Sequence, residues 1–508
     1  MTRALALLVL ALGVLAAPSA RGADGRFHPE LARAAAALAR TRGAEAYTAL
    51  RRVWNAWDRA DPLHVEEVLL AATKSPRLGP PERAYAATLA ALARVRRGDL
   101  AAAQAQLRAL GYLDRWLVLG PFSNEGKSGL FATHGPETEL SAPITPAKPY
   151  PGAERPVRWR AVPKDAFPYG FLDFASLVRP EAKVCAFAAS TVRDGDRAAK
   201  RRPVTVWVGS GGAFRMFWNG QEVFAHDAYT AHDFDRIAVT VPLEPGPNLL
   251  VLKVCGEDRA PVISVRVGDA RGAPIAGLFV SNDLADVAAA TERGAAPAPA
   301  ARLPQAVEGP VQWFRRITDR EGASAAQLEA HARYLDSTGG DDPARHLARD
   351  LAQRAAEREP TIERLLLAGK LSEDRNRANE WLTEAERRVA ASGAPNRDVL
   401  LARAYHRRGS PNFREALPYF ERVLALDPTD LDALRGLLEL YNLAGLPRTA
   451  LARIERAVEA RPHSVGLLAL YAAQLRLLGR TTDADEVEAR YSGFRFDDPG
   501  YLGQKLEL

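Results

Sequence analysis

Chemically reactive residues and their motifs are scarce in this chain. Cysteine occurs only twice in 508 residues, at Cys185 and Cys255. The sequence contains no HExxH, GxSxG or CxxC pattern, so the zinc-protease, serine-hydrolase and dithiol arrangements are missing. This leaves no residue on which an enzymatic reaction could rest. We therefore predict a protein without a catalytic site, a cofactor or a metal ion.

A phosphate-binding loop is missing as well, although "WLVLGPFSNEGKSG" at residues 116–129 looks like one. A Walker A loop places four residues between its first glycine and Gly-Lys-Ser/Thr, whereas five residues separate Gly120 from Gly126. Pro121 has no N–H to offer a phosphate. The segment that follows is rich in helix breakers, so the required helix is absent too.

Charge of one sign is not concentrated anywhere in the sequence. Lysine and arginine number 68 against 62 aspartates and glutamates, which leaves a formal charge of +6. The arginines are spread over predicted helical surfaces, whereas nucleic-acid binding favours a basic stripe with interleaved aromatics. We predict no nucleic-acid partner.

The N-terminus carries an apolar run of the kind that targets a protein for export. An early arginine, apolar residues from Ala4 to Ala17 and then small residues give residues 1–23 the layout of a signal peptide. The run is too short to span a bilayer comfortably, and no cysteine lies near the cleavage region to accept a lipid. We expect a mature N-terminus at Ala23 or Asp24, a periplasmic or secreted location, and no membrane span after cleavage.

Export bears on the two cysteines, which lie in strand-like runs. In an oxidising compartment Cys185 and Cys255 can form a disulfide, and closing a loop of this length would contribute about 4 kcal/mol in the chain-entropy model. The alternative is two buried thiols that act as small hydrophobic residues. We favour the disulfide.

Hydrophobic periodicity divides the chain into helical and strand-rich regions. Apolar residues recur at the helical period near both ends of the chain and at a period of two in the middle, where turn residues separate the runs. The predicted fold is multidomain α and β, with an antiparallel jelly-roll β-sandwich flanked by α-helical repeats. The expected regions are a helical region at 27–112, the sandwich at 113–280, a helix end and Ala/Pro linker at 281–310, degenerate helical repeats at 311–395, regular repeats at 396–491 and a tail at 492–508.

A spacing of 34 residues is visible in the last helical region. It separates Pro428 from Pro462 and Gly445 from Gly479. Small residues at fixed positions let two antiparallel helices approach, and a proline ends the second helix. The pattern resembles the tetratricopeptide repeat, whose packing positions are matched by Leu437, Tyr441, Gly445, Ala450, Ile454, Ala457 and Pro462.

The strand-rich region resembles the galactose-binding-like sandwich of secreted bacterial repeat proteins. The motifs that carry this resemblance are Trp116 to Phe122, the hairpin Trp218-Asn219-Gly220, and Gly246 to Val254. The resemblance implies tetratricopeptide-like helices on both sides and a likeness to the N-terminal half of transglutaminase-like-core proteins. We expect the sandwich core to include Trp116, Phe122, Trp207 and one face of the strand at 248–254.

A polar cluster in "FAHDAYTAHDFD" is the best candidate for a ligand loop in the sandwich. Imidazoles and carboxylates gathered at a loop edge could hold a glycan or an ion, and a neighbouring tryptophan could stack on a sugar. The alternatives are a solvated loop and a tryptophan packed in the core. The candidate glycan or ion loop comprises Trp218, Asn219, His226, Asp227, His232 and Asp233, with Asp235 beside them.

The concave face of the repeats is the candidate peptide-binding groove. In a tetratricopeptide array the first helix of each unit lines that face, and arginines there suit an acidic segment or the free C-terminus of a partner. The alternative is an empty, solvated groove. The groove positions are Asn396, Arg403, His406, Asp432, Arg435, Glu439, Asn442 and Arg476.

These features predict a non-catalytic, exported binding and scaffold protein. Its helical repeats would bind a partner protein or peptide, and the sandwich would be an accessory module. A carbohydrate-binding module that targets the chain to cell-wall or extracellular glycan is the alternative. A truncated targeting half of a transglutaminase-like protein is the second alternative.

Overall fold

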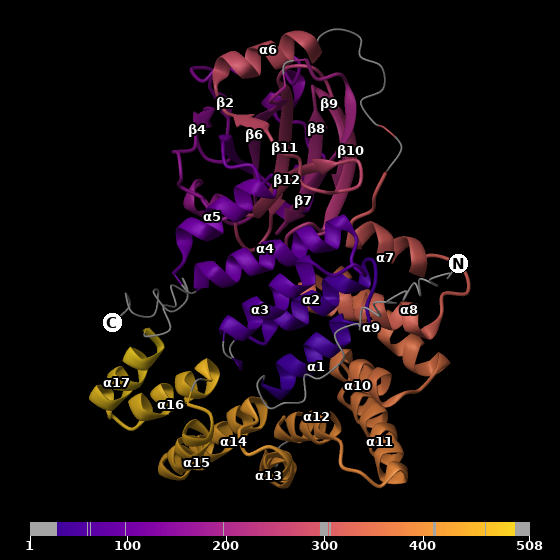
Figure 1. Ribbon diagram of the computed structural model, residues 1–508, viewed down its shortest axis with the longest axis vertical. Coiled ribbons are helices and arrows are strands. Elements are labelled where there is room, and N and C mark those ends of the chain that lie inside the picture. The colour runs from indigo at the N-terminus through magenta and orange to yellow at the C-terminus, as the bar shows by residue number, and fades with distance from the viewer. Residues whose placement is uncertain are drawn as a thin grey trace, which may run out of the picture.

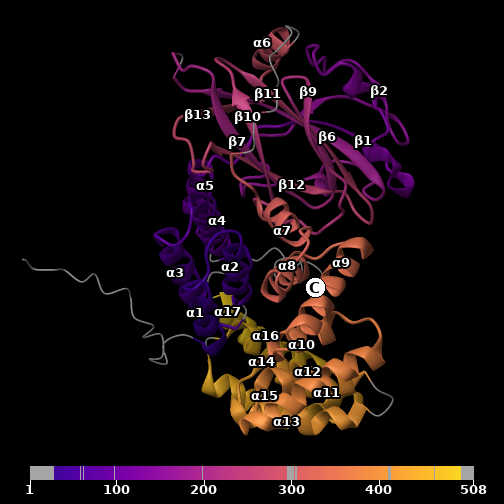
Figure 2. The same ribbon diagram turned by 90° about the vertical axis from the view of Figure 1, so that its right-hand side faces the viewer.

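A computed structural model describes residues 28–57, 59–60, 62–96, 98–196, 198–294, 303, 306–409, 413–462 and 464–492. The sandwich lies at the top of Figure 1 with the N-terminal helices beneath it, and the repeats curve around those helices from the right to the lower left. Figure 2 shows the N-terminal helices and the first helices of the repeat region side by side under the sandwich. The predicted signal peptide at 1–23 and nearly all of the tail at 492–508 lie outside the described residues.

The N-terminal region consists of helices that pack on one another around buried aromatics. Tyr47 and Tyr85 lie with their ring centroids 4.8 Å apart, and Leu50 is fully buried beside them. Gly98 adopts a positive φ at the turn between the last two helices, a conformation that costs glycine little. The helices are α1 (Pro29–Leu38), α2 (Glu45–Asn55), α3 (Pro62–Thr73), α4 (Pro80–Arg96) and α5 (Leu100–Ala109).

The middle region forms the predicted sandwich of facing antiparallel sheets. One sheet has the strand order β4-β1-β6-β11-β8-β9, with β13 also paired to β6, and the facing sheet has the order β10-β7-β12-β5. Strands β2 and β3 pair separately. The strands are β1 (Leu117–Ser123), β2 (Tyr150–Pro151), β3 (Pro156–Val157), β4 (Arg160–Ala161), β5 (Leu172–Asp173), β6 (Val184–Asp194), β7 (Arg202–Ser210), β8 (Ala213–Trp218), β9 (Gln221–His226), β10 (Ile237–Leu243), β11 (Asn248–Gly256), β12 (Val262–Asp269) and β13 (Leu278–Ser281).

Short helices complete the sandwich and cover its outer side. Helix α6 (Leu284–Gly294) buries Val287 and Ala290 against the sheet that contains β6 and β11. The segments η1 (Glu125–Leu130), η2 (Gly135–Thr138) and η3 (Phe174–Ser176) are 3-10 helices in the connections between strands.

Strand β11 places one face in the core between the sheets, as expected, and its other face is buried as well. Leu250 and Leu252 point into the core between the sheets, while Leu249 and Val251 pack in a separate cluster on the outer side. Because side chains alternate along a strand, both sets can be apolar only where loops and α6 cover the outside.

The three aromatics expected in the core are all buried, but two of them lie outside the space between the sheets. Trp116 lies between the sheets as predicted, but Phe122 belongs to the outer cluster under the loops. Trp207 is fully buried, yet its neighbours Val206 and Val208 are the residues that face the core. Alternation along β7 therefore places Trp207 on the opposite face, where the Arg266 guanidinium lies 4.9 Å from its ring centroid.

The repeat region consists of helix pairs stacked along a curved array. The helices that open successive pairs begin at Ile362, Arg397, Leu431 and Val465, so their starts are 34 or 35 residues apart. The elements are α7 (Pro310–Thr318), α8 (Ala325–Thr338), α9 (Asp342–Arg358), α10 (Ile362–Leu371), α11 (Arg375–Ser392), α12 (Arg397–Arg408), η4 (Phe413–Ala416), α13 (Leu417–Leu426), α14 (Leu431–Leu443), α15 (Pro447–Ala460), α16 (Val465–Leu477) and α17 (Thr481–Ser492).

Small residues set the distance between the helices of a pair. A β-carbon added at Gly436 in α14 would lie 2.1 Å from the ring of Phe420 in α13, so the packing there requires glycine. Ala450 and Ala457 are buried in α15 against the neighbouring helices. Ala416 and Ala484, 34 residues on either side of Ala450, are fully buried too, so at this position the small residue is a packing requirement that recurs.

Candidate functional site

A cleft lies among the first helices of the repeat region. Its volume is ≈ 700 Å³ and its walls come from α8, α10, α11 and α12. Leu366, Leu401 and Tyr405 are half-buried and give the cleft an apolar floor. The charged residues of its rim are Arg333, Asp336, Glu363, Lys370, Arg375 and Asp398.

The rim is held in place by contacts between successive repeats. The Lys370 ammonium lies 2.7 Å from the Asp336 carboxylate on the preceding opening helix. Arg375 donates to the backbone oxygen of His406 at 3.1 Å, which joins α11 to α12. These bonds fix the width of the cleft while leaving its apolar floor exposed to a ligand.

The cleft continues into the space between the repeats and the N-terminal helices. A second hollow of ≈ 570 Å³ shares Lys370 and Asp398 with the cleft and reaches α1 and α2. A third of ≈ 340 Å³ shares Arg333 and Glu363 with it. The three hollows therefore adjoin one another. Figure 1 shows α1 and α2 on the inner side of the curve formed by the repeat helices.

His406 is the predicted groove residue that lines this cleft. Burial, followed by the charges of Arg403 and Arg375, lowers the pKa of its imidazole. Asn396 lies at the start of the same helix, where its side chain accepts hydrogen bonds from the backbone N–H groups of Asp398 and Val399. Asn396 is thus a helix cap, and its side-chain oxygen is used within the chain.

Arg403 does not face a groove, and the prediction that it binds a partner is wrong. Its side chain is buried and donates to Asn379 at 2.6 Å, Thr383 at 3.1 Å and Glu386 at 2.6 Å. All three acceptors lie on α11. Arg403 therefore joins neighbouring repeats. Its position in the repeat sequence could not reveal that its guanidinium already donates to residues of α11.

Asp432 is likewise used within the molecule, at a junction between the repeats and the N-terminal helices. Arg59 donates to both oxygens of Asp432 at 2.8 Å, and Arg397 donates to it at 2.9 Å. Glu30 on α1 accepts from both arginines, at 2.7 Å and 3.1 Å. Burial raises the pKa of Asp432, but the Arg59 and Arg397 charges more than offset this, so its pKa is lowered.

The remaining groove positions lie on the repeats outside the cleft lining. Arg435 is exposed, and Glu439 pairs with Arg408 on the preceding opening helix. Asn442 exchanges hydrogen bonds with Gln474, and Arg476 pairs with Asp485 and Glu488 on α17. The contacts of Glu439 and Asn442 join neighbouring repeats, as those of Arg403 do, whereas the contacts of Arg476 join the two helices of one pair.

The predicted stacking tryptophan of the sandwich is a core residue. Trp218 is fully buried between the sheets, and its indole N–H donates to the Pro242 oxygen at 2.8 Å. Asn219 adopts a positive φ at the β8–β9 turn and accepts from the Leu249 N–H at 2.8 Å. Neither side chain is available to a sugar, so the glycan reading of this hairpin is wrong.

The second half of the candidate loop is buried against the N-terminal helices. Asp233 accepts from Arg51 at 2.9 Å and from the Tyr85 hydroxyl at 2.9 Å. The His232 ring lies 3.0 Å from the Ser264 hydroxyl, and burial lowers its pKa to about 3, with help from the charges of nearby arginines. The described residues contain no His/Cys/Asp/Glu group arranged to hold a metal.

Asp235 belongs to the same buried interface. It accepts from Arg266 at 2.8 Å and from the Tyr112 hydroxyl at 3.3 Å, and both Asp235 and Arg266 are almost fully buried. Burial raises the pKa of Asp235 even though Arg266 opposes the change. The polar loop thus joins the sandwich to the N-terminal helices. His226 and Asp227 lie at its other end and line a separate pocket.

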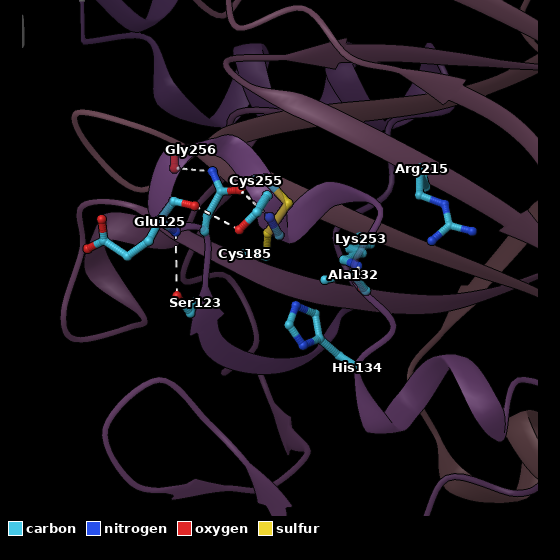
Figure 3. The surroundings of a disulfide bond; sticks show 12 residues. Ser123, Glu125, Ala132, His134, Cys185, Arg215, Lys253, Cys255 and Gly256 are labelled. Carbon is cyan, nitrogen blue, oxygen red and sulfur yellow. Dashed lines mark hydrogen bonds between the residues drawn. A yellow bond between two sulfur atoms is a disulfide. The ribbon is translucent and has the colours of Figure 1, made fainter.

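Cys185 and Cys255 form a disulfide between directly paired positions of β6 and β11. Figure 3 shows it beneath the turn that carries Glu125. The Asn124 side chain holds this turn by accepting from the Gly129 N–H at 3.0 Å and donating to the Gly256 oxygen at 2.9 Å. The segment that resembles a phosphate loop is therefore a 3-10 turn packed over the disulfide.

Comparison with known proteins identifies the repeat region alone. A family model of the tetratricopeptide repeat matches residues 408–473. A mutant form of MamA is 15% identical with a TM-score of 0.24, over 34% of this chain and 94% of that one. YrrB, described as a TPR protein with an unusual peptide-binding site, is 18% identical with a TM-score of 0.26, over 38% and 97%. A search of curated proteins gives no match.

The chain therefore contains tetratricopeptide repeats together with a β-sheet-rich region. Among the described residues, no helix combines the length and the apolar character needed to span a bilayer. Sequence reasoning missed Arg397, Lys370 and Tyr405, which shape the junction and the cleft. Arg397 and Tyr405 lie on α12 with the predicted positions Arg403 and His406, so that helix was identified but the orientation of its face was not. Lys370 lies on α10, where no groove position was predicted.

Proposed function

We propose that this protein is an exported scaffold whose repeats bind an extended segment of a partner protein in the cleft. Three adjoining hollows carry this proposal, because each offers space for a side chain of one extended segment. Tetratricopeptide repeats suggest protein–protein interaction. The apolar floor at Leu366, Leu401 and Tyr405 favours apolar side chains in the bound segment.

The charges along this path favour an acidic partner segment. The hollow next to α1 is lined by Arg33, Arg52, Arg59, Lys370 and Arg397 against only Glu30 and Asp398. Burial, followed by repulsion from Arg333, lowers the pKa of Arg52. No carboxylate of the described chain pairs with the Arg52 guanidinium, so a carboxylate of the partner could bind there.

The sandwich supports this function as an accessory module that positions the N-terminal helices. Arg51 and Tyr85 on those helices bond to Asp233 of the sandwich, which places α1 and α2 opposite the repeats. Of the candidate glycan loop, four residues are used within the fold and only His226 and Asp227 line a pocket, so we do not favour carbohydrate binding. The four residues are Trp218, Asn219, His232 and Asp233. A likeness to the N-terminal half of transglutaminase-like proteins stays a proposal carried by the sandwich motifs.

Export to the periplasm or beyond is part of the proposal. The layout of residues 1–23 supports it, and so does the cross-strand disulfide, since such bonds persist in oxidising compartments. The intact mass of protein from a periplasmic fraction should correspond to a chain that begins at Ala23 or Asp24. A mass that still includes the first twenty residues would contradict export with cleavage.

Co-purification with cleft variants tests the binding proposal. Leu401→Glu places a charge on the apolar floor, and Lys370→Glu reverses a charge on the rim, so both should reduce recovery of the partner. Leu443→Glu is the matched control, because Leu443 is 65% exposed on another opening helix and does not line the cleft. Recovery that is lost only with Leu443→Glu would move the binding site to another face.

A further inference from the structure

A polar pocket lies where the sandwich meets the first helices of the repeat region. Its volume is ≈ 290 Å³ and it shares no lining residue with the cleft. The connection between β9 and β10 forms one wall, and α7, α8 and the start of α9 form the others. The lining residues that matter here are His226, Asp227, Arg236, Val311, Arg315 and His331.

Arg236 is a buried cation without an acidic partner. Only 3% of its surface is exposed, and its Nη1 donates to the Thr230 hydroxyl and to the Ala231 oxygen at 2.9 Å. Its Nε has no hydrogen-bond partner, and no described carboxylate lies within ion-pair distance of the guanidinium. Burying a charge without a counter-ion is costly, so the site is electrostatically incomplete.

Arg315 adds a second cation at the mouth of the same pocket. Its side chain is exposed and forms no ion pair with the described residues. Burial, followed by the charges of Arg236 and Arg315, lowers the pKa of His226 to about 3. Burial and the charge of Arg315 lower that of His331 to about 4. Both imidazoles are therefore neutral near pH 7 and leave the positive charge of the arginines unchanged.

The carboxylates of the pocket do not neutralise this charge. Asp341 caps α9 by accepting from the Ala344 N–H at 3.3 Å, and it also pairs with Lys127 at 3.2 Å. Asp227 is exposed at the edge. Val311 and Leu347 supply an apolar side.

We propose that this pocket binds a small organic acid, with its carboxylate between Arg236 and Arg315 and its apolar body against Val311 and Leu347. A guanidinium can bind a carboxylate through two parallel hydrogen bonds. The pocket is too small for a folded partner and is near the lower end of the size range for small-molecule sites. The proposal does not depend on the repeat cleft.

The test uses the mature full-length protein with benzoate and hexanoate as probes, and benzamide and hexanamide as uncharged counterparts. We expect both acids to raise the unfolding temperature and to shift the imidazole resonances of His226 and His331, and the amides to do neither. Arg315→Met should weaken benzoate binding roughly tenfold or more, since a charge-assisted hydrogen bond is lost. Arg316→Met is the matched control, because Arg316 pairs with Glu308 on the other side of α7.

The outcomes separate the proposal from its alternatives. Equal shifts with acids and amides would overturn it, as would benzoate binding that is unchanged in Arg315→Met. Phosphate that binds as well as benzoate at matched ionic strength would also overturn it, since the apolar side would then contribute nothing. Arg236→Met is the second variant. It should abolish the acid-dependent shift, and a folded variant that keeps the shift would contradict the assigned role of Arg236.

Discussion

The sandwich and the repeats differ in where their charged pairs lie, although the repeats also bury arginines such as Arg403. In the sandwich, Arg266, Asp235 and Lys253 are buried with almost no exposed surface, each held by a specific partner. In the repeats, charged pairs such as Lys370 with Asp336 lie at the surface and join one repeat to the next. Removing the partner of a buried charge should therefore destabilise the whole sandwich. Removing a surface pair in the repeats should destabilise only the adjacent repeats.

The two regions should also differ in how cooperatively they unfold, because their contacts join residues at different separations along the chain. Leu117 of β1 pairs with Ala189 of β6 across a long stretch of chain, while each repeat contacts mainly the adjacent units. Distant pairings form only when the whole sheet forms. A stacked array behaves as a sum of units and interfaces. The sandwich should therefore unfold as one unit, and the repeats should open locally.

The largest expected effect comes from breaking the buried pair in the sandwich. Asp235→Asn leaves the Arg266 guanidinium buried without its counter-ion, and we expect a loss of about 3 to 5 kcal/mol in the free energy of unfolding. Urea unfolding followed by tryptophan fluorescence measures it. Because Trp207 lies against Arg266, its signal should report the same transition as circular dichroism in the β-sheet region.

A double variant distinguishes the cost of an unpaired charge from loss of packing. Asp235→Leu with Arg266→Met removes both charges and keeps apolar volume, so most of the stability should return. If the double variant were as unstable as Asp235→Asn, the pair would not be the source of the effect. The difference in stability effects between the sandwich and the repeats would then come from packing and not from buried charge.

Gly436→Ala should have the next largest effect, and only in the repeats. The new methyl group would overlap the ring of Phe420, and overpacking of this kind costs about 1 to 3 kcal/mol. Hydrogen exchange should become faster in α13 and α14 and stay unchanged in the sandwich. Adding Phe420→Leu should restore part of the loss by making room. Faster exchange throughout the sandwich would contradict local opening.

The junction between the repeats and the N-terminal helices should show a smaller, acid-sensitive effect. Arg59→Met removes the bidentate bond to Asp432, and we expect a loss of about 1 to 2 kcal/mol, between the values for exposed and buried pairs. Hydrogen exchange in α1 and in the first turn of α14 measures it. Arg40→Met, on the exposed end of the same helical region, is the control and should change neither segment.

Acid should act on the same junction in the wild-type protein. The pKa of Asp432 is lowered in the folded state, so its stabilising contribution is present above its unfolded pKa of about 4 and is lost as the pH falls through the folded value. Opening of α1 at pH 3 but not at pH 6, after correction for intrinsic exchange rates, is the expected result. An Arg59→Met protein should lack most of this acid response.

The sequence predicted the repeats well because their signal is local. The 34-residue spacing of glycine, alanine and proline reflects packing between adjacent helices, and it needs no knowledge of distant segments. The orientation of each opening helix was less accessible, since Arg403 and Asp432 look solvent-facing until α11 and α1 are placed beside them.

The sandwich was predicted in kind but not in detail. Alternating strands indicated the architecture, yet Trp207 was assigned to the wrong face, because no pattern within β7 distinguishes a core face from a face covered by other helices. The loop with Asp233 and Asp235 looked like a solvated ligand site for the same reason. Its partners Arg51, Tyr85 and Arg266 lie far away in the chain.

The smallest expected effect compares two serines, of which only Ser324 is followed by the S-x-x-Q pattern of a capping box. Ser324 and Ser464 both precede an opening helix. The Ser324 hydroxyl accepts from the Gln327 N–H at 3.2 Å, and the Gln327 side chain completes the capping box. Ser464 makes no side-chain cap hydrogen bond.

Ser324→Ala should therefore cost about 1 kcal/mol, the usual value for loss of a cap, and Ser464→Ala should cost clearly less. Hydrogen exchange in the first turn of α8 measures the loss in Ser324→Ala, and exchange in the first turn of α16 measures the loss in Ser464→Ala. Both variants place alanine at a capping position, so the change in helix propensity is the same in both. The informative result is therefore which variant loses more stability. Equal losses would mean that buried packing at Ser464, which is 6% exposed, contributes as much as the cap at Ser324.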